Sequence, residues 1–232
     1  MLKKLSLAVA VASTTLTGMA YAETIDSPAG KFDVSMTTTL ATDYISRGNS
    51  YNNGNPTIQG SLDVAHESGL YVGVWGSSLA NDQKTSGAEF DYYIGFAGSI
   101  TEDVSYDVSV ATYVYSGTTW TGENGPENAP SDIEYVGSLS AYGATVGVKY
   151  RSKDVKQMYY HLGYDLELPA GFGLSASVGQ TQFDDKDDGD DYVDWRVGVS
   201  KTLIGLDLGL AYASNDIDEN DDHFVFSVSK TF

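Results

Sequence analysis

Alternation of apolar and polar side chains, repeated in paired segments of about ten residues, is the feature that most constrains this chain. In residues 57–79, apolar positions of one parity alternate with polar or small ones on both sides of a turn at residues 66–69. The apolar positions are Ile58, Leu62, Val64, Leu70, Val72 and Val74. Successive side chains of a strand point to opposite faces, and Gly69 suits the backbone of a short connection. The stretch therefore predicts a β-hairpin with one apolar face.

The same unit recurs to residue 232 and predicts about twelve strands, with ten and fourteen left open because pattern alone fixes strand ends only to within a few residues. Short turns alternate with longer polar loops, of which residues 116–130 are the longest. All prolines fall between the expected strands, where a missing backbone donor breaks no ladder. They are Pro28, Pro56, Pro126, Pro130 and Pro169.

The chain begins with the marks of a secretory signal peptide. Lys3 and Lys4 precede a short apolar run, and the pattern A-x-A ends at Ala22, so we expect residues 1–22 to be cleaved. A retained membrane anchor is the alternative, although the run is shorter than the roughly 20 apolar residues that a spanning helix needs. Residues 23–30 are expected to form a short flexible lead, and residues 31–232 one β-domain.

No later segment is continuously apolar over such a length, so a chain of this kind could span a membrane only as a closed barrel. Charges of both signs lie on the polar strand faces, which suits a wet or ion-paired lumen. Aromatic residues gather near strand ends, as interfacial girdles require. Examples are Tyr44, Tyr150, Tyr164, Tyr212 and Phe232. We expect an all-β, transmembrane, antiparallel up-and-down β-barrel; a secreted soluble β-sandwich is the alternative.

Charge and composition exclude several classes of function. The net charge is -19, and residues 1–22 contain two lysines and no acidic residue, so the cleaved chain carries -21. Nucleic acid is therefore not an expected partner, because Lys and Arg drive phosphate binding. The chain has no cysteine, hence no disulfide and no cysteine-based metal site, and no pattern implies a cofactor.

One segment resembles a known family, the TorF-like porins of Gram-negative bacteria. The matching residues are Ala41-Thr42-Asp43-Tyr44, Arg47-Gly48, Gln59-Gly60, residues 66–77 (HESGLYVGVWGS), and then Glu89, Asp91, Tyr93 and Gly95. The remainder matches only in its alternation. Residues 224–232 resemble the terminal sorting signal of outer-membrane barrels, with Lys230 departing from the usual apolar choice. The resemblance implies an outer-membrane barrel that acts as a channel, and it implies no enzymatic residues.

The polar parity places a set of charged and aromatic side chains toward the lumen. They are Asp43, Arg47, Tyr71, Trp75, Glu89, Asp91 and Tyr93. We hypothesise that Arg47 faces Glu89 and Asp91 in the outer half of the barrel and forms a charged constriction beside Trp75, with Tyr71 deeper. The alternative is that these side chains fill and rigidify the lumen, because a barrel of about twelve strands lies between the filled and the open kinds.

Two further groups could carry chemistry. The acidic run at Asp184, Asp185, Asp187 and Asp188 invites a calcium interpretation, but Lys186 and Trp195 occupy ligand positions of the EF-hand pattern. A weak cation loop, or calcium bridging to lipopolysaccharide, is one interpretation, and a solvated loop is the other. His161, with Asp165 on the same face, could serve a barrel-wall hydrolase, but no nucleophile is marked by its local sequence.

The sequence thus predicts a narrow, mildly cation-preferring pore for small solutes or ions in the outer membrane of a Gram-negative bacterium. Both termini are expected in the periplasm, and lipid and lipopolysaccharide are the expected partners. A non-conducting structural or adhesive barrel is the second interpretation, and a membrane hydrolase the third.

Overall fold

The computed structural model describes residues 23–81, 85–117, 132–152, 155–217 and 222–232. The predicted signal peptide and most of the longest predicted loop lie outside these residues. The elements are β1 (Glu23–Ser27), β2 (Gly30–Ala41), β3 (Ile45–Ser46), β4 (Asn49–Ser50), β5 (Thr57–His66), β6 (Leu70–Asn81), β7 (Thr85–Ser99), β8 (Val104–Gly117), β9 (Asp132–Ala141), β10 (Ala144–Arg151), β11 (Gln157–Leu168), the 3-10 helix η2 (Pro169–Gly171), β12 (Phe172–Phe183), β13 (Tyr192–Leu203), β14 (Leu206–Asn215) and β15 (His223–Thr231). No helix in this part of the chain is long and apolar enough to cross a membrane.

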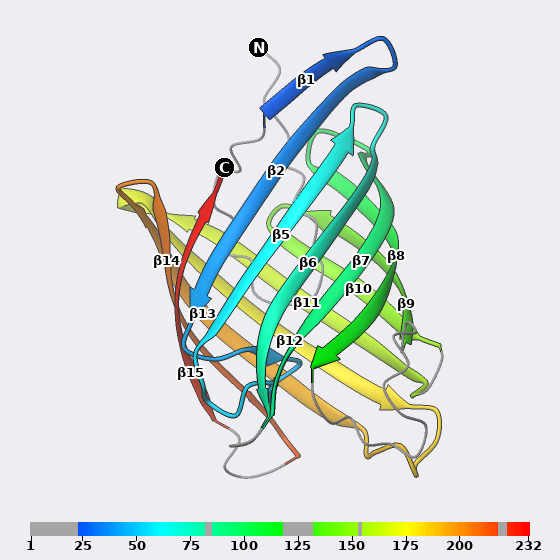
Figure 1. Ribbon diagram of the computed structural model, residues 1–232, viewed down its shortest axis with the longest axis vertical. Coiled ribbons are helices and arrows are strands. Elements are labelled where there is room, and N and C mark those ends of the chain that lie inside the picture. Colours follow the sequence, from blue (N-terminus) through cyan, green and yellow to red (C-terminus); the bar gives the residue numbers. More distant parts are fainter. Residues whose placement is uncertain (1–22, 82–84, 118–131, 153–154, 218–221) are drawn as a thin grey trace.

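The described strands form a closed antiparallel β-barrel (Figure 1). Strands β5 to β15 each pair with their neighbours in sequence, and β2 closes the ring by pairing with β5 on one edge and β15 on the other. The wall therefore has twelve strands, β2 and β5 to β15, in up-and-down order. The prediction of an up-and-down barrel of about twelve strands is confirmed.

The first strand lies outside this closed ring. In place of the expected flexible lead at residues 23–30, β1 pairs with the first half of β2, from Ser27↔Gly30 to Glu23↔Val34. Strand β15 pairs with the second half of the same edge, from Thr37↔Thr231 to Ala41↔Ser227. Sequence alternation is weak before Gly30, which is why the strand was not predicted; its pairing comes from the free edge that β2 leaves beyond β15.

The outward face of the wall is apolar, as the alternation predicted. Large hydrophobic side chains of one parity are exposed along the strands, for example Leu40, Ile58, Ile94, Val146 and Leu210. The opposite parity carries polar and charged side chains into the barrel. This is the arrangement of a barrel that faces lipid outside and water inside.

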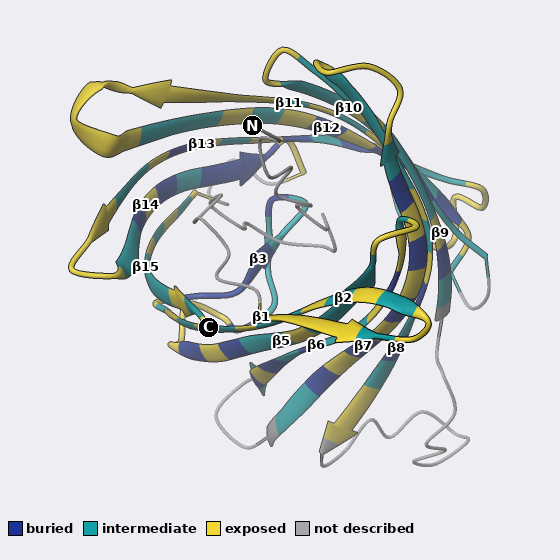
Figure 2. Ribbon diagram, turned by 90° about the horizontal axis from the view of Figure 1, so that it is seen from above, coloured by how far each residue is buried: buried dark blue, intermediate teal, exposed yellow. Residues whose placement is uncertain are grey.

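The two ends of the barrel differ in the length of their connections. At the short-turn end, turns at residues 67–69, 142–143 and 204–205 join the strands, and the C-terminus lies there (Figure 1). The longer connections, which include residues 42–56 and 184–191, lie at the opposite, long-loop end. Figure 2 shows that β3, within the first of these connections, lies inside the ring of strands.

Candidate functional site in the barrel lumen

Residues 42–56, termed the lumen loop, leave the barrel wall after β2 and enter its interior. Apolar and polar side chains alternate from residue 31 to residue 47 and so predict a strand of that length, but β2 ends at Ala41. Phe226 donates its backbone N–H to Thr42 Oγ1, and Thr42 N–H donates to Phe226 O, both at 3.0 Å. These bonds to β15 mark the point at which the chain leaves the wall.

The tip of the lumen loop is a tight hairpin between β3 and β4. Arg47 and Gly48 have φ values of 50° and 76°, the left-handed geometry of a two-residue hairpin turn. A side chain at Gly48 would place its Cβ 2.7 Å from Ser214 O and 2.8 Å from Asn215 Cβ, both on β14. The tip is therefore packed against the wall, and only glycine fits there.

Hydrogen bonds within the loop hold its shape. Ser50 Oγ lies 2.9 Å and 2.8 Å from the two carboxylate oxygens of Asp43, and Tyr44 N–H donates to Asp43 Oδ1 at 2.7 Å. Asn52 Nδ2 donates to Asn55 O at 2.8 Å, and Ala80 N–H of β6 donates to Asn52 Oδ1 at 2.5 Å. Asp43 and Asn52 are both buried, so a folded loop, and not a solvated one, occupies the lumen.

Arg47 connects the loop tip to strand β9. Its Nη2 lies 2.5 Å from Glu134 Oε2, and Tyr113 of β8 donates its hydroxyl to Glu134 Oε1 at 2.7 Å. Arg151 Nε of β10 lies 4.0 Å from the same carboxylate, and the Arg47 guanidinium carbon lies 4.5 Å from the ring centroid of Tyr159 on β11. One buried carboxylate thus holds two arginines, one from the loop and one from the wall.

A second set of hydrogen bonds attaches the tip to the wall on β13 and β14. Asn215 Nδ2 donates to Gly48 O at 3.0 Å, and Asn49 Nδ2 donates to the Tyr192 hydroxyl at 3.1 Å. The lumen loop connects β2 to β5, and its tip is bonded to β9 on one side of the lumen and to β13 and β14 on the other. It narrows the barrel near the long-loop end.

Aromatic side chains fill the part of the lumen beside β5 to β8. Tyr44 of the loop packs on Trp75 at a ring-centroid distance of 5.3 Å, and Tyr71 meets Tyr93 at 6.4 Å. Tyr71 donates its hydroxyl to Asp107 at 2.8 Å, and Tyr93 donates to Asp63. Tyr44 is 2% exposed and Trp75 8% exposed. Tyr44, predicted as a lipid-facing girdle residue, lies inside the barrel because the chain has already left the wall.

The structure brings all seven predicted lumen residues inside the barrel but pairs them differently. Arg47 forms its ion pair with Glu134, in place of the expected Glu89 and Asp91. Glu89 accepts a hydrogen bond from the Tyr115 hydroxyl at 3.1 Å, and both carboxylate oxygens of Asp91, which is 0% exposed, are without a partner in the described part of the chain. Glu134 and Arg151 carried the right polar parity, yet no local motif marked them as partners of Arg47.

The predicted cation loop connects β12 to β13 at the long-loop end. Asp184, Asp185, Asp187 and Asp188 are exposed, and Lys186 Nζ lies 2.6 Å from Asp191 Oδ1. Hydrogen bonding to the Lys186 ammonium lowers the pKa of the Asp191 carboxyl below its ordinary value. Among the residues that the structure describes, no three acidic or histidine side chains are grouped as a metal site would require.

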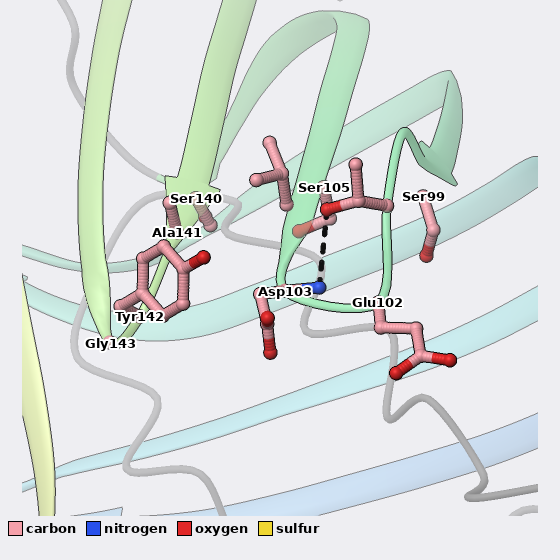
Figure 3. Close-up of a pocket in the computed structure, with 10 residues that line it drawn as sticks. Ser99, Glu102, Asp103, Ser105, Ser140, Ala141, Tyr142 and Gly143 are labelled. Atoms are coloured by element: carbon pink, nitrogen blue, oxygen red, sulfur yellow. Dashed lines mark hydrogen bonds between the residues drawn. The ribbon is translucent and has the colours of Figure 1, made fainter.

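A shallow pocket lies at the rim of the short-turn end, between the turns that follow β7 and β9 (Figure 3). Ser99, Glu102, Ser140 and Tyr142 are among its lining residues, and Asp103 N–H donates to Thr101 Oγ1 at 3.3 Å. It belongs to the turns and shares no residue with the lumen loop.

Comparisons with known proteins agree with the architecture. A family model described as "Bacterial protein of unknown function (Gcw_chp)" matches residues 25–232. The search of curated proteins gave no match. Among solved structures, a KdgM porin has a TM-score of 0.52 at 9% identity, with coverage of 85% of this chain and 99% of that chain. A membrane protein from work on in-meso crystallization has a TM-score of 0.51 at 12% identity, with coverage of 85% and 83%. At such identities the likeness concerns the fold alone.

Proposed function

Because this chain belongs to the Gcw_chp family of bacterial proteins of unknown function, we propose its role from its own geometry: a passive, porin-like channel of the outer membrane. The observation that carries the proposal is a closed barrel with an apolar outer face and a polar lumen, narrowed by a folded loop. A lumen of this kind conducts water-soluble solutes and limits their size. We also propose that the resemblance of residues 41–95 to TorF-like porins reflects this shared role.

The asymmetry of the barrel supports an orientation. Outer-membrane barrels place short turns in the periplasm and longer loops outside, so the short-turn end and both termini are proposed to be periplasmic. The lumen loop then lies in the outer half of the barrel, near the entrance. Lipid and lipopolysaccharide are the proposed surroundings of the apolar outer face.

The charge of the chain supports a mild cation preference. The acidic loop at residues 184–191 lies at the long-loop end, and a negative field at an entrance raises the local concentration of cations. The constriction itself contains both signs of charge, as in the pair of Arg47 and Glu134. Selection by charge is therefore proposed to occur at the entrance more than at the constriction.

One observation favours a second candidate, a structural or adhesive barrel that does not conduct. Tyr44, Tyr71, Trp75 and Tyr93 pack into one buried cluster inside the barrel. If the remaining lumen, beside β10 to β14, is too narrow for hydrated ions, the loop and this cluster act as a plug. Function would then lie in what the outer loops bind.

We propose that the barrel acts without catalysis. His161, the candidate base of a barrel-wall hydrolase, packs on Tyr159 at a ring-centroid distance of 5.9 Å, and its Nδ1 has no hydrogen-bond partner in the portion of the chain described. A hydrolytic triad requires a nucleophile and an orienting group bonded to the histidine. Ester hydrolysis by the refolded protein, abolished in His161→Ala, would contradict this.

Single-channel recording tests the proposal directly. The purified, refolded protein is inserted into a planar bilayer under a salt gradient. Discrete current steps with a reversal potential on the cation side are expected. A folded barrel that gives no current would contradict the pore and favour the plugged barrel, and a reversal potential on the chloride side would contradict the charge preference alone.

A further inference from the structure

Two side chains of opposite charge on β13 point into the lumen without pairing with each other. Asp194 and Arg196 occupy alternate positions of the strand and so share one face. Tyr159 donates its hydroxyl to Asp194 Oδ1 at 3.2 Å, whereas Asp194 Oδ2 is buried with no partner in the residues described. Arg196 Nε is buried and likewise has no acceptor there. Each side chain thus has one buried polar atom without a hydrogen-bond partner among the residues described.

The wall positions around Arg196 carry small side chains. Arg196 lies opposite Ser177 on β12 and Ala213 on β14, and Gly198 follows it on the same face. None of these residues has a side chain long enough to cover an arginine. Arg196 as a whole is partly exposed, whereas its Nε is buried.

The pair lies directly below the tip of the lumen loop. A Cβ built at Gly48 would come 3.0 Å from Asp194 Cβ, so Asp194 touches the tip. Arg196 is two residues further along β13, toward the short-turn end. Tyr159, which donates to Asp194, also carries the Arg47 guanidinium over its ring at 4.5 Å, so Arg47 is a further charged group beside this pair. Asp194 is 6% exposed beneath the tip, and Arg196 is partly exposed next to it.

We propose that Asp194 and Arg196 form a subsite for zwitterionic solutes, with the solute's ammonium on Asp194 and its carboxylate on Arg196. Residues two apart on a strand are separated by roughly 7 Å, which leaves room between their side chains for the two charged groups of an α-amino acid. A buried charge is stable only when it is paired, and the guanidinium fork matches a carboxylate. A simple anion would leave Asp194 unpaired, and a simple cation would leave Arg196 unpaired, whereas a zwitterion satisfies both.

This inference rests on the proposed pore, because the solute reaches β13 through the lumen. The test compares the rates at which glycine and glycolamide, a neutral solute of similar size, swell proteoliposomes that contain the full barrel. Arg196→Gln and Asp194→Asn are each expected to slow glycine several-fold and to leave glycolamide unchanged. Lys201→Gln is the matched control, because it removes one cation from the outer face of β13, where Lys201 lies 4.2 Å from the Phe172 ring centroid.

Equal slowing of both solutes, or of neither, would overturn the subsite. Acetate and methylammonium are added as competitors of glycine flux. Competition by acetate alone, with Asp194→Asn unaffected, would show a plain anion site and overturn the zwitterion assignment.

If the wild-type barrel passes neither solute, the pore proposal fails, and binding is then measured by saturation-transfer NMR of glycine on the refolded protein in detergent. A signal that Arg196→Gln abolishes supports the subsite, and no signal from the wild type overturns it.

Discussion

The guanidinium of Arg47 and the carboxylate of Glu134 meet at 2.5 Å inside the barrel, although β5 to β8 separate their points of attachment along the wall. Through this contact the lumen loop, which connects two wall strands, crosses the inside of the barrel instead of staying at its rim. Because Glu134 also receives the Tyr113 hydroxyl and faces Arg151, its charge is compensated from three directions. The loop is therefore held in one position by a carboxylate that the wall has already oriented.

Removing Arg47 should release the loop tip. Arg47→Ala is expected to raise single-channel conductance and to change ion selectivity, because the tip loses its only described ion pair and the constriction gains space. Lys31→Ala is the control, since Lys31 pairs with Asp26 at 3.8 Å in an exposed ion pair at the short-turn end, away from the loop tip. Conductance and selectivity that stay at wild-type values in Arg47→Ala would exclude the loop as the constriction.

Removing Glu134 should cost stability as well. Glu134→Ala leaves the loop and wall arginines without their shared buried carboxylate, and the loss of one partner of a buried pair typically costs about 3–5 kcal/mol. Water in the lumen lowers that cost, so a value near the lower limit is expected in urea unfolding of the refolded barrel. The double variant Arg47→Ala/Glu134→Ala should be more stable than Glu134→Ala alone; strictly additive losses would show that the two residues do not interact.

The tip glycine offers a matched pair of variants. Gly48 and Gly54 have similar φ values of +76° and +71°, but a Cβ at Gly48 meets the β14 wall, whereas a Cβ at Gly54 has no atom within 4 Å. Gly54→Ala should cost only the left-handed backbone penalty of about 1–2 kcal/mol. Gly48→Ala should cost more in unfolding free energy and should also raise conductance. Equal costs in the two variants would mean that the tip is not packed against the wall.

Substitutions of two tryptophans, one inside the barrel and one on its outer face, distinguish the role of the aromatic cluster from that of the wall. Trp75 lies in the lumen at 8% exposure, whereas Trp195 is 36% exposed on the outer face of β13. Trp75→Ala is expected to destabilise the barrel by about 3–5 kcal/mol and to widen the pore, because a buried aromatic ring is lost. Trp195→Ala should leave conductance unchanged. A plugged barrel predicts current only in Trp75→Ala, so the same recordings distinguish the two proposed functions.

Single introduced cysteines can report how the barrel is oriented in the membrane, because the chain contains no cysteine of its own. Ile204, at the short-turn end, is 90% exposed, and Asp187 is exposed in the acidic loop at the other end. On intact cells, a membrane-impermeant thiol reagent should label Asp187→Cys and spare Ile204→Cys until the outer membrane is opened. The reverse pattern would place the termini outside the cell.

Much of the wall could be predicted from sequence, because the alternation within each strand shows which side chains point outward and which point inward. Ile58 and Leu210 point outward and Glu89 and Asp194 inward, as two-residue periodicity requires. Periodicity is a local property, so neighbouring residues suffice to determine it. The same property explains the count of twelve strands in the wall.

The lumen loop could not be predicted in the same way. Alternation continues through Tyr44, so parity extended the strand past Ala41 and placed Tyr44 toward lipid, but it is buried inside. Whether a chain continues in the wall or turns inward depends on contacts with distant strands, here Asn215 and Glu134. The alternation puts Asp43 and Arg47 on a strand, whereas the structure places them on the lumen loop.

One edge of β2 is shared between β1 and β15, and this sharing determines how the barrel closes. Strand β15 reaches β2 only from Ser227↔Ala41 to Thr231↔Thr37, with Phe232 extending the ladder to Met36, so the first and last wall strands share a short seam. Closing the ring therefore pairs two strands from opposite ends of the described chain. The β1 hairpin covers the edge of β2 from Gly30 to Val34, and within the described residues β1 itself keeps an unpaired outer edge. The ring is thus closed by a short ladder between β2 and β15, and β1 pairs with the part of β2 that this ladder leaves free.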